Sequence, residues 1–166
     1  MSIQNILVDN NLSIMCKDID VSGDFTLDGN SISVLNEAHA RTVTYTGDST
    51  TQTKTLYFQR VNNIVNVLIP AISYTVPVGA DKPGYFSIDI SDLSDFTVKS
   101  AGPSGDTNTA VTVTNSGTIT TGTVQVNTNN TITIKLVTSG STGTNFTGTN
   151  NTSQGIPLQH IISYYH

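Results

Sequence analysis

The sequence carries little charge and almost no cysteine. Charged residues make up 11% of its 166 positions, and the seven Lys and Arg residues are scattered along the chain. A nucleic-acid groove or a polybasic membrane patch needs clustered cations, so we expect neither partner. Cys16 is the only cysteine, which excludes an internal disulfide and a cysteine-based metal site.

Long apolar runs, helix formers and tryptophan are also scarce. The stretch 67–72 is far too short to cross a bilayer. Residues 1–12 lack the basic and apolar regions of a secretory signal, which indicates synthesis in a cytoplasm unless a signal has been removed. With 9 Leu, 6 Ala and 1 Glu, the chain does not suit a helical bundle. The absence of Trp argues against the usual aromatic sugar platform.

β-branched residues dominate instead, with 27 Thr, 16 Ile and 15 Val. From about residue 42, strand patterns recur at the spacing typical of sandwiches and barrels. Phe86, Ile88 and Ile90 alternate with polar residues, as in an antiparallel sheet covered on one side. The expected strands are 42–46, 54–61, 64–69, 72–76, 84–90, 95–99, 110–114, 118–121, 123–127, 131–137 and 159–165. These patterns predict an all-β, antiparallel fold.

The first 40 residues have a different texture. Their alternating runs are short and are interrupted by the turn signals at 22–24 and 28–30. Such short strands bury too little surface alone, so we interpret residues 1–40 as a β-stalk or anchor segment and residues 41–166 as a head. Residues 36–41 form the only locally helix-compatible stretch, which we interpret as the joint. The Ser-, Thr-, Gly- and Asn-rich segment 139–154 is a candidate for disorder.

Two expected strands, 64–69 and 161–165, carry large apolar groups on both sides. One side of such a strand meets the core of a sandwich, and the other needs a second cover. We expect that cover to be another chain, with a loop of the same chain as the alternative. Burial of Ile162 and Tyr164 within a single chain would remove this argument for assembly.

Several motifs near the carboxyl end resemble a known fold family. They are 117–119 (GTI), 124–126 (VQV), 130–134 (NTITI), 145–148 (NFTG) and 161–165 (IISYY). This pattern resembles the trimeric TNF/complement-like jelly-roll heads of viral and phage fibres, including surface proteins of giant viruses and virophages. Residues 19–30 likewise resemble segments that open virion fibre proteins. The loop 138–154 departs from the family, because Thr and Asn replace its tandem glycines.

The resemblance implies an antiparallel, TNF-like jelly-roll β-sandwich that forms a homotrimer, with the final strand near the three-fold axis. The trimer-interface residues expected on this basis are Tyr164, Tyr165, Ile162, Phe146, Val65 and Val67. The implied function is a non-enzymatic structural protein of the virion surface that attaches to a host or viral glycan or protein, without a cofactor. Contacts would come from loops 47–53, 78–84, 101–109 and 138–154, because loops on a rigid scaffold usually carry recognition.

Two other function classes stay open. A secreted or surface carbohydrate-binding module would act as a monomer, and native mass separates it from a trimer. A glycosidase would need two carboxylates flanking a cleft, and the sequence does not single out such a pair. No Gly-x-Ser-x-Gly nucleophile turn is present.

Metal ligands form only weak patterns. Residues 18–24 imitate the start of a calcium loop, but Gly29 stands where the acidic twelfth ligand is required, so a strand and turn is the better interpretation. Asp89, Asp92 and Asp95 would hold a cation only if the three carboxylates converge; a solvated turn is the alternative.

The histidines and the single cysteine likewise do not define a catalytic or metal site. His39, His160 and His166 are too dispersed for a single-chain site, although one of them from each copy could meet a metal on a three-fold axis. Cys16 is most simply a small strand residue, with a reactive thiol as the alternative. Glycosylation sequons occur at Asn11, Asn129, Asn145, Asn150 and Asn151. We expect no bound metal.

Overall fold

The computed structural model describes residues 25–27, 30–32, 34–99, 107–137 and 143–166. The chain divides into two compact units, Met1–Ile32 and Ser33–His166. In the first unit, β1 (Phe25–Leu27) and β2 (Asn30–Ile32) form an antiparallel hairpin. The calcium-like pattern at 18–24 and the position of Cys16 lie outside the described residues.

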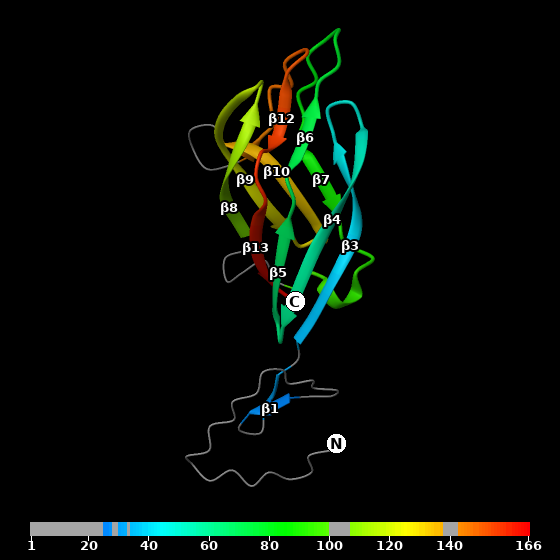
Figure 1. The fold of residues 1–166 in the computed structure, drawn as a ribbon, viewed down its shortest axis with the longest axis vertical. Helices are drawn as coiled ribbons and strands as arrows, with labels where there is room; N and C mark the ends of the chain where they lie inside the picture. The colour runs from blue at the N-terminus through cyan, green and yellow to red at the C-terminus, as the bar shows by residue number, and fades with distance from the viewer. Residues whose placement is uncertain (1–24, 28–29, 33, 100–106, 138–142) are drawn as a thin grey trace. The chain divides into compact units, whose positions relative to one another are not determined.

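The second unit is a single 11-stranded antiparallel sheet that curls around one core (Figure 1). Its strand order is β13-β5-β4-β3-β7-β10-β9-β8-β12-β6, with β11 paired to β10. The strands are β3 (Val34–Tyr45), β4 (Thr50–Val61), β5 (Ile64–Ile69), β6 (Ile72–Thr75), β7 (Phe86–Asp89), β8 (Thr107–Asn115), β9 (Thr118–Asn127), β10 (Thr131–Val137), β11 (Gly143–Thr144), β12 (Ser153–Ile156) and β13 (His160–Tyr165). The all-β antiparallel sandwich is therefore confirmed. Among the described residues, no helix is long and apolar enough to span a bilayer.

Turn residues set the lengths of the strands. Ser116 (φ 52°) and Gly117 (φ 77°) join β8 to β9, where Asn115 pairs with Thr118. Two positive φ values in a two-residue turn match the right-handed twist of a hairpin, which explains why small or polar residues stand there. Asn62 and Asn130 also have positive φ, in the turns that join β4 to β5 and β9 to β10, where the sequence predicts turns.

The core follows the alternation read from the sequence. In β7, Phe86 and Ile88 are fully buried, and Ile132 and Ile134 of β10 pair with them in register. Phe86 also contacts Phe146 edge to face, with ring centroids 5.5 Å apart. Each large apolar side chain buried in this way contributes about 1.5–3 kcal/mol.

Several local predictions are wrong. Residues 36–41 are not a helical joint, because β3 pairs with β4 along its whole length, from Val34 opposite Val61 to Tyr45 opposite Thr50. The expected strand 95–99 gives way to the 3-10 helix η1 (Ser94–Phe96). The expected strands 118–121 and 123–127 are one continuous strand, β9. Disorder does not extend over 143–154, where β11 and part of β12 lie.

The two strands with apolar groups on both sides each place one side in the core of this single chain. Val65 and Val67 of β5 are fully buried, and Ile162 and Tyr164 of β13 are only 2% exposed. The expectation that one copy cannot hide Ile162 and Tyr164 is therefore wrong, because β13 lies beside β5 with this side toward the core. The opposite side stays open, with Ile161 61% exposed.

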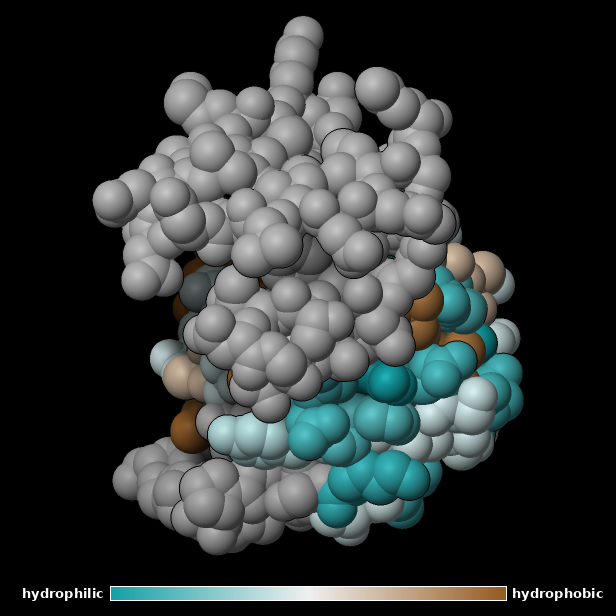
Figure 2. Space-filling model, turned by 90° about the horizontal axis from the view of Figure 1, so that it is seen from below, coloured by the Kyte–Doolittle hydropathy of each residue, from teal (hydrophilic) through white to brown (hydrophobic). Residues whose placement is uncertain are grey.

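That open side continues across four neighbouring strands, β13, β5, β4 and β3. We call it the outer face. It consists of the even-numbered residues of β3 from Val34 to Thr44, the odd-numbered residues of β4 from Thr51 to Val61, the even-numbered residues of β5 from Ile64 to Leu68, and the odd-numbered residues of β13 from Ile161 to Tyr165. In the end view of Figure 2, hydrophilic side chains cover most of the described area that is visible, with a few hydrophobic groups among them.

Candidate functional site

Several loops of the second unit meet at one end, at the top of Figure 1. This loop end comprises the turn 46–49 between β3 and β4, the segment 76–85 between β6 and β7, the turn 116–117, and residues 145–152 before β12. The predicted contact loops 47–53 and 78–84 and the later part of 138–154 belong here, although 50–53 already lie in β4. Residues 100–106 and 138–142 lie outside the described part of the chain.

Backbone hydrogen bonds join these loops to one another. The Lys82 N–H donates to the Gly148 carbonyl (2.7 Å), and Gly84 and Phe146 exchange N–H···O bonds of 3.2 and 2.7 Å. Gly148 has a positive φ of 59°, and a Cβ there would come within 1.8 Å of the Lys82 carbonyl oxygen. Only glycine therefore allows this approach. The buried ring of Phe146 anchors the crossing, so the loop end is a fixed surface.

Hydroxyl and amide groups cluster on one part of the loop end. The Ser116 hydroxyl lies 2.5 Å from Thr147 Oγ1 and 2.7 Å from Thr149 Oγ1. Asn115 Oδ1 accepts hydrogen bonds from the Thr147 N–H (3.0 Å) and hydroxyl (3.1 Å). We call these four residues the hydroxyl cluster. Hydroxyls both donate and accept, so the cluster is equipped to bind a neutral ligand rich in hydroxyl groups.

A second polar group surrounds two stacked tyrosines. The rings of Tyr45 and Tyr74 are 4.4 Å apart, the Tyr45 hydroxyl donates to the Lys82 carbonyl (2.7 Å), and the Tyr74 hydroxyl donates to Asp48. Burial raises the pKa of Tyr45 to about 12, and burial with the Asp48 hydrogen bond raises the pKa of Tyr74 to about 12. Partial burial opposes ionisation of Asp48, but hydrogen bonds from Tyr74 and Thr50 outweigh it and lower its pKa.

The remaining carboxylate of the loop end also has a structural partner. Asp81 Oδ1 accepts from the Asn150 N–H (2.8 Å), and Asn150 Oδ1 accepts from the Gly79 N–H (3.0 Å). Both carboxylates of the loop end, Asp48 and Asp81, thus order their own loops. The side chain of Asn150, one of the sequon residues, is one of the groups that hold these loops together.

The predicted interface residues lie mostly inside the chain. Five of them are buried to 2% exposure or less and pack in the core; these are Ile162, Tyr164, Phe146, Val65 and Val67. Tyr165 is 47% exposed and lies on the outer face. The sequence could not show which side of these strands faces the core, so the prediction that these residues form a trimer interface stays a prediction. Residues of the outer face that the sequence analysis did not single out, including Tyr57, Leu68 and Ile161, line a hollow of about 440 Å³ there.

The three regularly spaced aspartates do not converge. Asp89 accepts from the Ser91 N–H (2.8 Å), Asp92 pairs with Arg41 (2.5 Å), and Asp95 lies 3.8 Å from Arg60. The hydrogen bond from Arg41 lowers the pKa of the Asp92 carboxyl. The described residues contain no group of three side chains placed to hold a metal ion.

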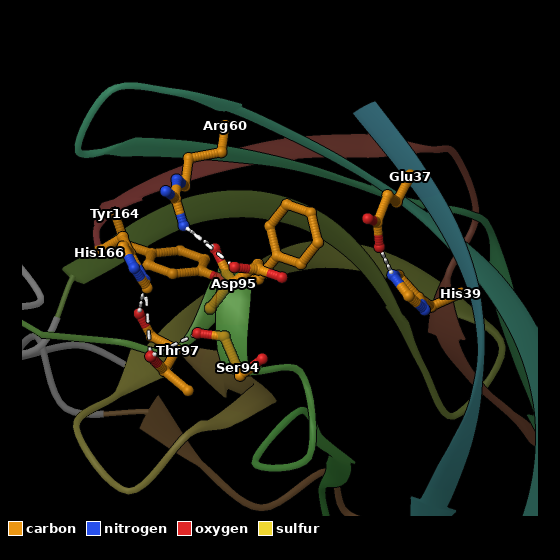
Figure 3. Close-up of polar contacts among 9 residues, drawn as sticks. Glu37, His39, Arg60, Ser94, Asp95, Thr97, Tyr164 and His166 are labelled. Atoms are coloured by element: carbon orange, nitrogen blue, oxygen red, sulfur yellow. Dashed lines mark hydrogen bonds and ion pairs between the residues drawn. The ribbon is translucent and has the colours of Figure 1, made fainter. Parts of the chain in front are cut away.

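The three histidines have separate surroundings. His39 Nε2 lies 2.6 Å from Glu37, and His166 donates from Nδ1 to the Thr97 carbonyl (3.0 Å), as Figure 3 shows. His160 begins β13, and burial lowers its pKa. Within one chain they therefore form no shared site.

Of the comparisons with known proteins, the one with solved structures finds a similarity. No protein-family model matches the chain, and no curated protein matches it. Among solved structures, the chain is similar to the reovirus attachment protein sigma1 in complex with α-2,3-sialyllactose, at 17% identity and a TM-score of 0.45. The match covers 81% of this chain and 66% of that one, which is just under two thirds of its length.

Proposed function

We propose that the chain is a non-enzymatic structural protein of a virion surface, homotrimeric and of the fibre-head kind. It attaches through its loop end to a glycan or protein on a host or viral surface. The stalk or anchor, expected over residues 1–40, corresponds to the first unit, Met1–Ile32, because residues 34–40 pair with β4 in the second unit. The observation that carries the attachment role is the hydroxyl cluster, held on loops that backbone hydrogen bonds fix to one another.

The chemistry of the loop end favours a neutral, hydroxyl-rich ligand. Ser116, Thr147 and Thr149 present hydroxyls within 3.3 Å of one another, so a sugar ring would meet several donors and acceptors at once. One such site, without tryptophan, would bind weakly. Three identical sites on one assembly gain effective concentration, which converts weak binding into firm attachment.

The carboxylates support a binding role over hydrolysis. A glycosidase holds its two carboxyl groups on either side of the scissile bond. At the loop end, Asp48 is bonded to Tyr74 and Thr50, and Asp81 to Asn150. Each carboxylate therefore organises a turn.

The alternative is a monomeric carbohydrate-binding module. The burial of Ile162 and Tyr164 within one chain favours it, because a single copy already closes its core. Native mass distinguishes the two: the monomer weighs 17.6 kDa and the trimer about three times as much.

A glycan array with the intact chain tests the attachment role. We expect binding to a subset of glycans, and we expect Ser116→Ala combined with Thr147→Val to weaken it at least tenfold, since hydroxyl contacts are lost. Thr128→Val, in the exposed turn between β9 and β10, is the matched control. Full binding by the double variant would remove the loop end from the proposal, and an array without any bound glycan would leave only a protein receptor.

A further inference from the structure

We propose that the outer face is the surface through which copies of this chain associate, lying around the axis of the assembly. This inference deepens the proposed function, from which it takes the number of copies. It rests on three independent features of the outer face: its exposed apolar rows, its lack of charge and its area.

The strand register places the apolar residues of the outer face in rows that run across all four strands. Ala38, Tyr57, Leu68 and Ile161 are consecutive partners in one row. Two residues further along each strand, Asn36, Gln59, Asn66 and Ser163 form a polar row. The next step gives a second apolar row of Val34, Val61, Ile64 and Tyr165. The pattern is thus apolar, polar, apolar across the whole width of this part of the sheet.

These rows hold most of the exposed hydrophobic surface. Of the eight large hydrophobic side chains exposed in the described part of the chain, five lie on the outer face, with exposed fractions of 47–61%; these are Val34, Tyr57, Ile64, Ile161 and Tyr165. Scattered exposed apolar residues are ordinary, but a contiguous patch marks a contact surface. The hollow of about 440 Å³ between Tyr57, Leu68 and Ile161 offers room for side chains of a partner.

The outer face carries no Lys, Arg, Asp, Glu or His. The four charged residues of its strands, Glu37, Arg41, Lys54 and Arg60, all occupy the opposite side. There Arg41 bonds to Asp92, and Arg60 donates to the Asp95 carbonyl (2.7 Å) and lies near its carboxylate (Figure 3). In a solvated antiparallel sheet, the charged residues face water instead. The reversal shows that charge is kept away from this side.

A neutral surface favours a copy of the same chain as the partner. Residues close to a three-fold axis lie near their own equivalents, so a charge there would face like charges in a chain whose net charge is already −5. A partner of different charge would be selected by complementary ions, and the outer face offers none. Amides and hydroxyls are self-complementary, because each both donates and accepts.

The polar row also specifies how copies would align. The Ser163 hydroxyl donates to Asn66 Oδ1 (2.6 Å), and Gln59 Nε2 donates to Asn36 Oδ1 (3.1 Å). These bonds link the side chains of neighbouring strands in pairs, and each amide has more donor and acceptor positions than one bond uses. A polar row between two apolar rows matches itself in one alignment, since a shifted copy would bury amides against hydrocarbon.

The area is adequate for an assembly. The outer face presents eighteen side chains. With strands about 4.8 Å apart and one outward residue every 6.8 Å or so, they cover roughly 600 Å² of flat sheet. Stable interfaces remove roughly 600–1,000 Å² from each partner, and protruding side chains add to the flat value.

Charge insertion tests this inference, with native mass as the measurement on the full chain. We expect Tyr57→Asp and Ile161→Asp to raise the dissociation constant of the assembly at least a hundredfold and to yield monomers at micromolar concentration. Val78→Asp and Leu158→Asp are the matched controls, because these apolar side chains are 80% and 70% exposed but lie off the outer face. The controls should keep the mass of the unaltered chain.

A substitution that changes the side chain less tests the same surface in case the first variants do not fold. Asn66→Asp keeps the shape of the side chain and adds one charge to the polar row, and Asn129→Asp adds the same charge to an exposed turn. Only the former should dissociate the assembly at neutral pH, with circular dichroism unchanged. If all these variants stay trimeric, the outer face is not the interface, although the proposed trimer stands. If the unaltered chain is a monomer, both the interface and the proposed trimer are overturned.

Discussion

The two sides of the four strands β13, β5, β4 and β3 differ in a way opposite to most surface sheets. The core side carries the large buried groups and, beyond the edge of the core, the charged residues that hold the segment around η1. The outer face is neutral and carries most of the exposed hydrophobic groups. Judged by hydrophobicity alone, both sides of these strands would belong to the interior of the chain. The placement of charge separates the side that closes one chain from the side available to another.

Separate substitutions of the two adjacent tyrosines of β13 should show the largest difference in stability between the two sides of the strand. Tyr164 is buried and its hydroxyl donates to the Phe96 carbonyl (2.6 Å), whereas Tyr165 is 47% exposed. We expect Tyr164→Ala to lower the free energy of unfolding by about 3–5 kcal/mol, because it leaves a cavity. Tyr165→Ala should change it by less than about 1 kcal/mol within each chain, since that side chain packs on nothing in the core.

Urea unfolding at a protein concentration low enough to keep the chain monomeric gives both values without a contribution from contacts between copies. Equal losses for the two variants would mean that the two sides of β13 are not distinct in the way we describe.

The loop end offers a second comparison, between two glycines of positive φ. A Cβ at Gly148 would meet the Lys82 carbonyl at 1.8 Å, whereas one at Gly117 would meet nothing within 4 Å. We therefore expect Gly148→Ala to lower the free energy of unfolding by about 1–3 kcal/mol more than Gly117→Ala does. It should also weaken glycan binding while leaving native mass unchanged. A change in mass would show that the loop end and the assembly surface are not independent.

A smaller effect should appear in acid. Hydrogen bonds from Tyr74 and Thr50 outweigh partial burial and hold the pKa of Asp48 below its ordinary value of 3.8 in the folded chain. Asp48 therefore adds stability above that ordinary value, and the contribution is lost as pH falls through the lowered pKa. Melting temperatures measured between neutral pH and pH 3 or so should decline less for Asp48→Asn than for the unaltered chain. Parallel curves would contradict the role of this carboxylate in ordering the turn 46–49.

The smallest effect is spectroscopic. Tyr45 and Tyr74 have pKa values raised to about 12, so alkaline titration of phenolate absorbance should show a late phase. Because these values exceed the ordinary 10.0, both groups add stability below that pH and lose it as pH rises toward 12. Tyr74→Phe should reduce the late phase, with circular dichroism recording whether the fold persists. An unchanged late phase would place Tyr74 outside the buried pair.

Sequence patterns sufficed for the fold class because alternation and turn residues are local. Phe86, Ile88 and the turns at 62–63 and 116–117 lie where the sequence predicts them. Residues 36–41 misled because Glu, Ala and Arg favour helices, whereas pairing with β4 determines the outcome. Local propensity cannot show a partner that lies elsewhere in the chain.

The candidate sites depended on information that a sequence does not display. Tyr165 opposes Ile64, and a shift of one residue in that register would exchange the buried and exposed sides of β13. The apolar character of both sides was visible, but not which side faces the core. The hydroxyl cluster likewise joins Asn115 and Ser116 to Thr147 and Thr149, which lie far along the chain.

The native mass of the unaltered chain over a dilution series tests most directly whether copies of the chain cover the outer face. We predict a species near 53 kDa, three times 17.6 kDa, that dissociates only on strong dilution. A chain that stays at 17.6 kDa throughout the micromolar range, with Tyr57 and Ile161 open to water, would contradict the account.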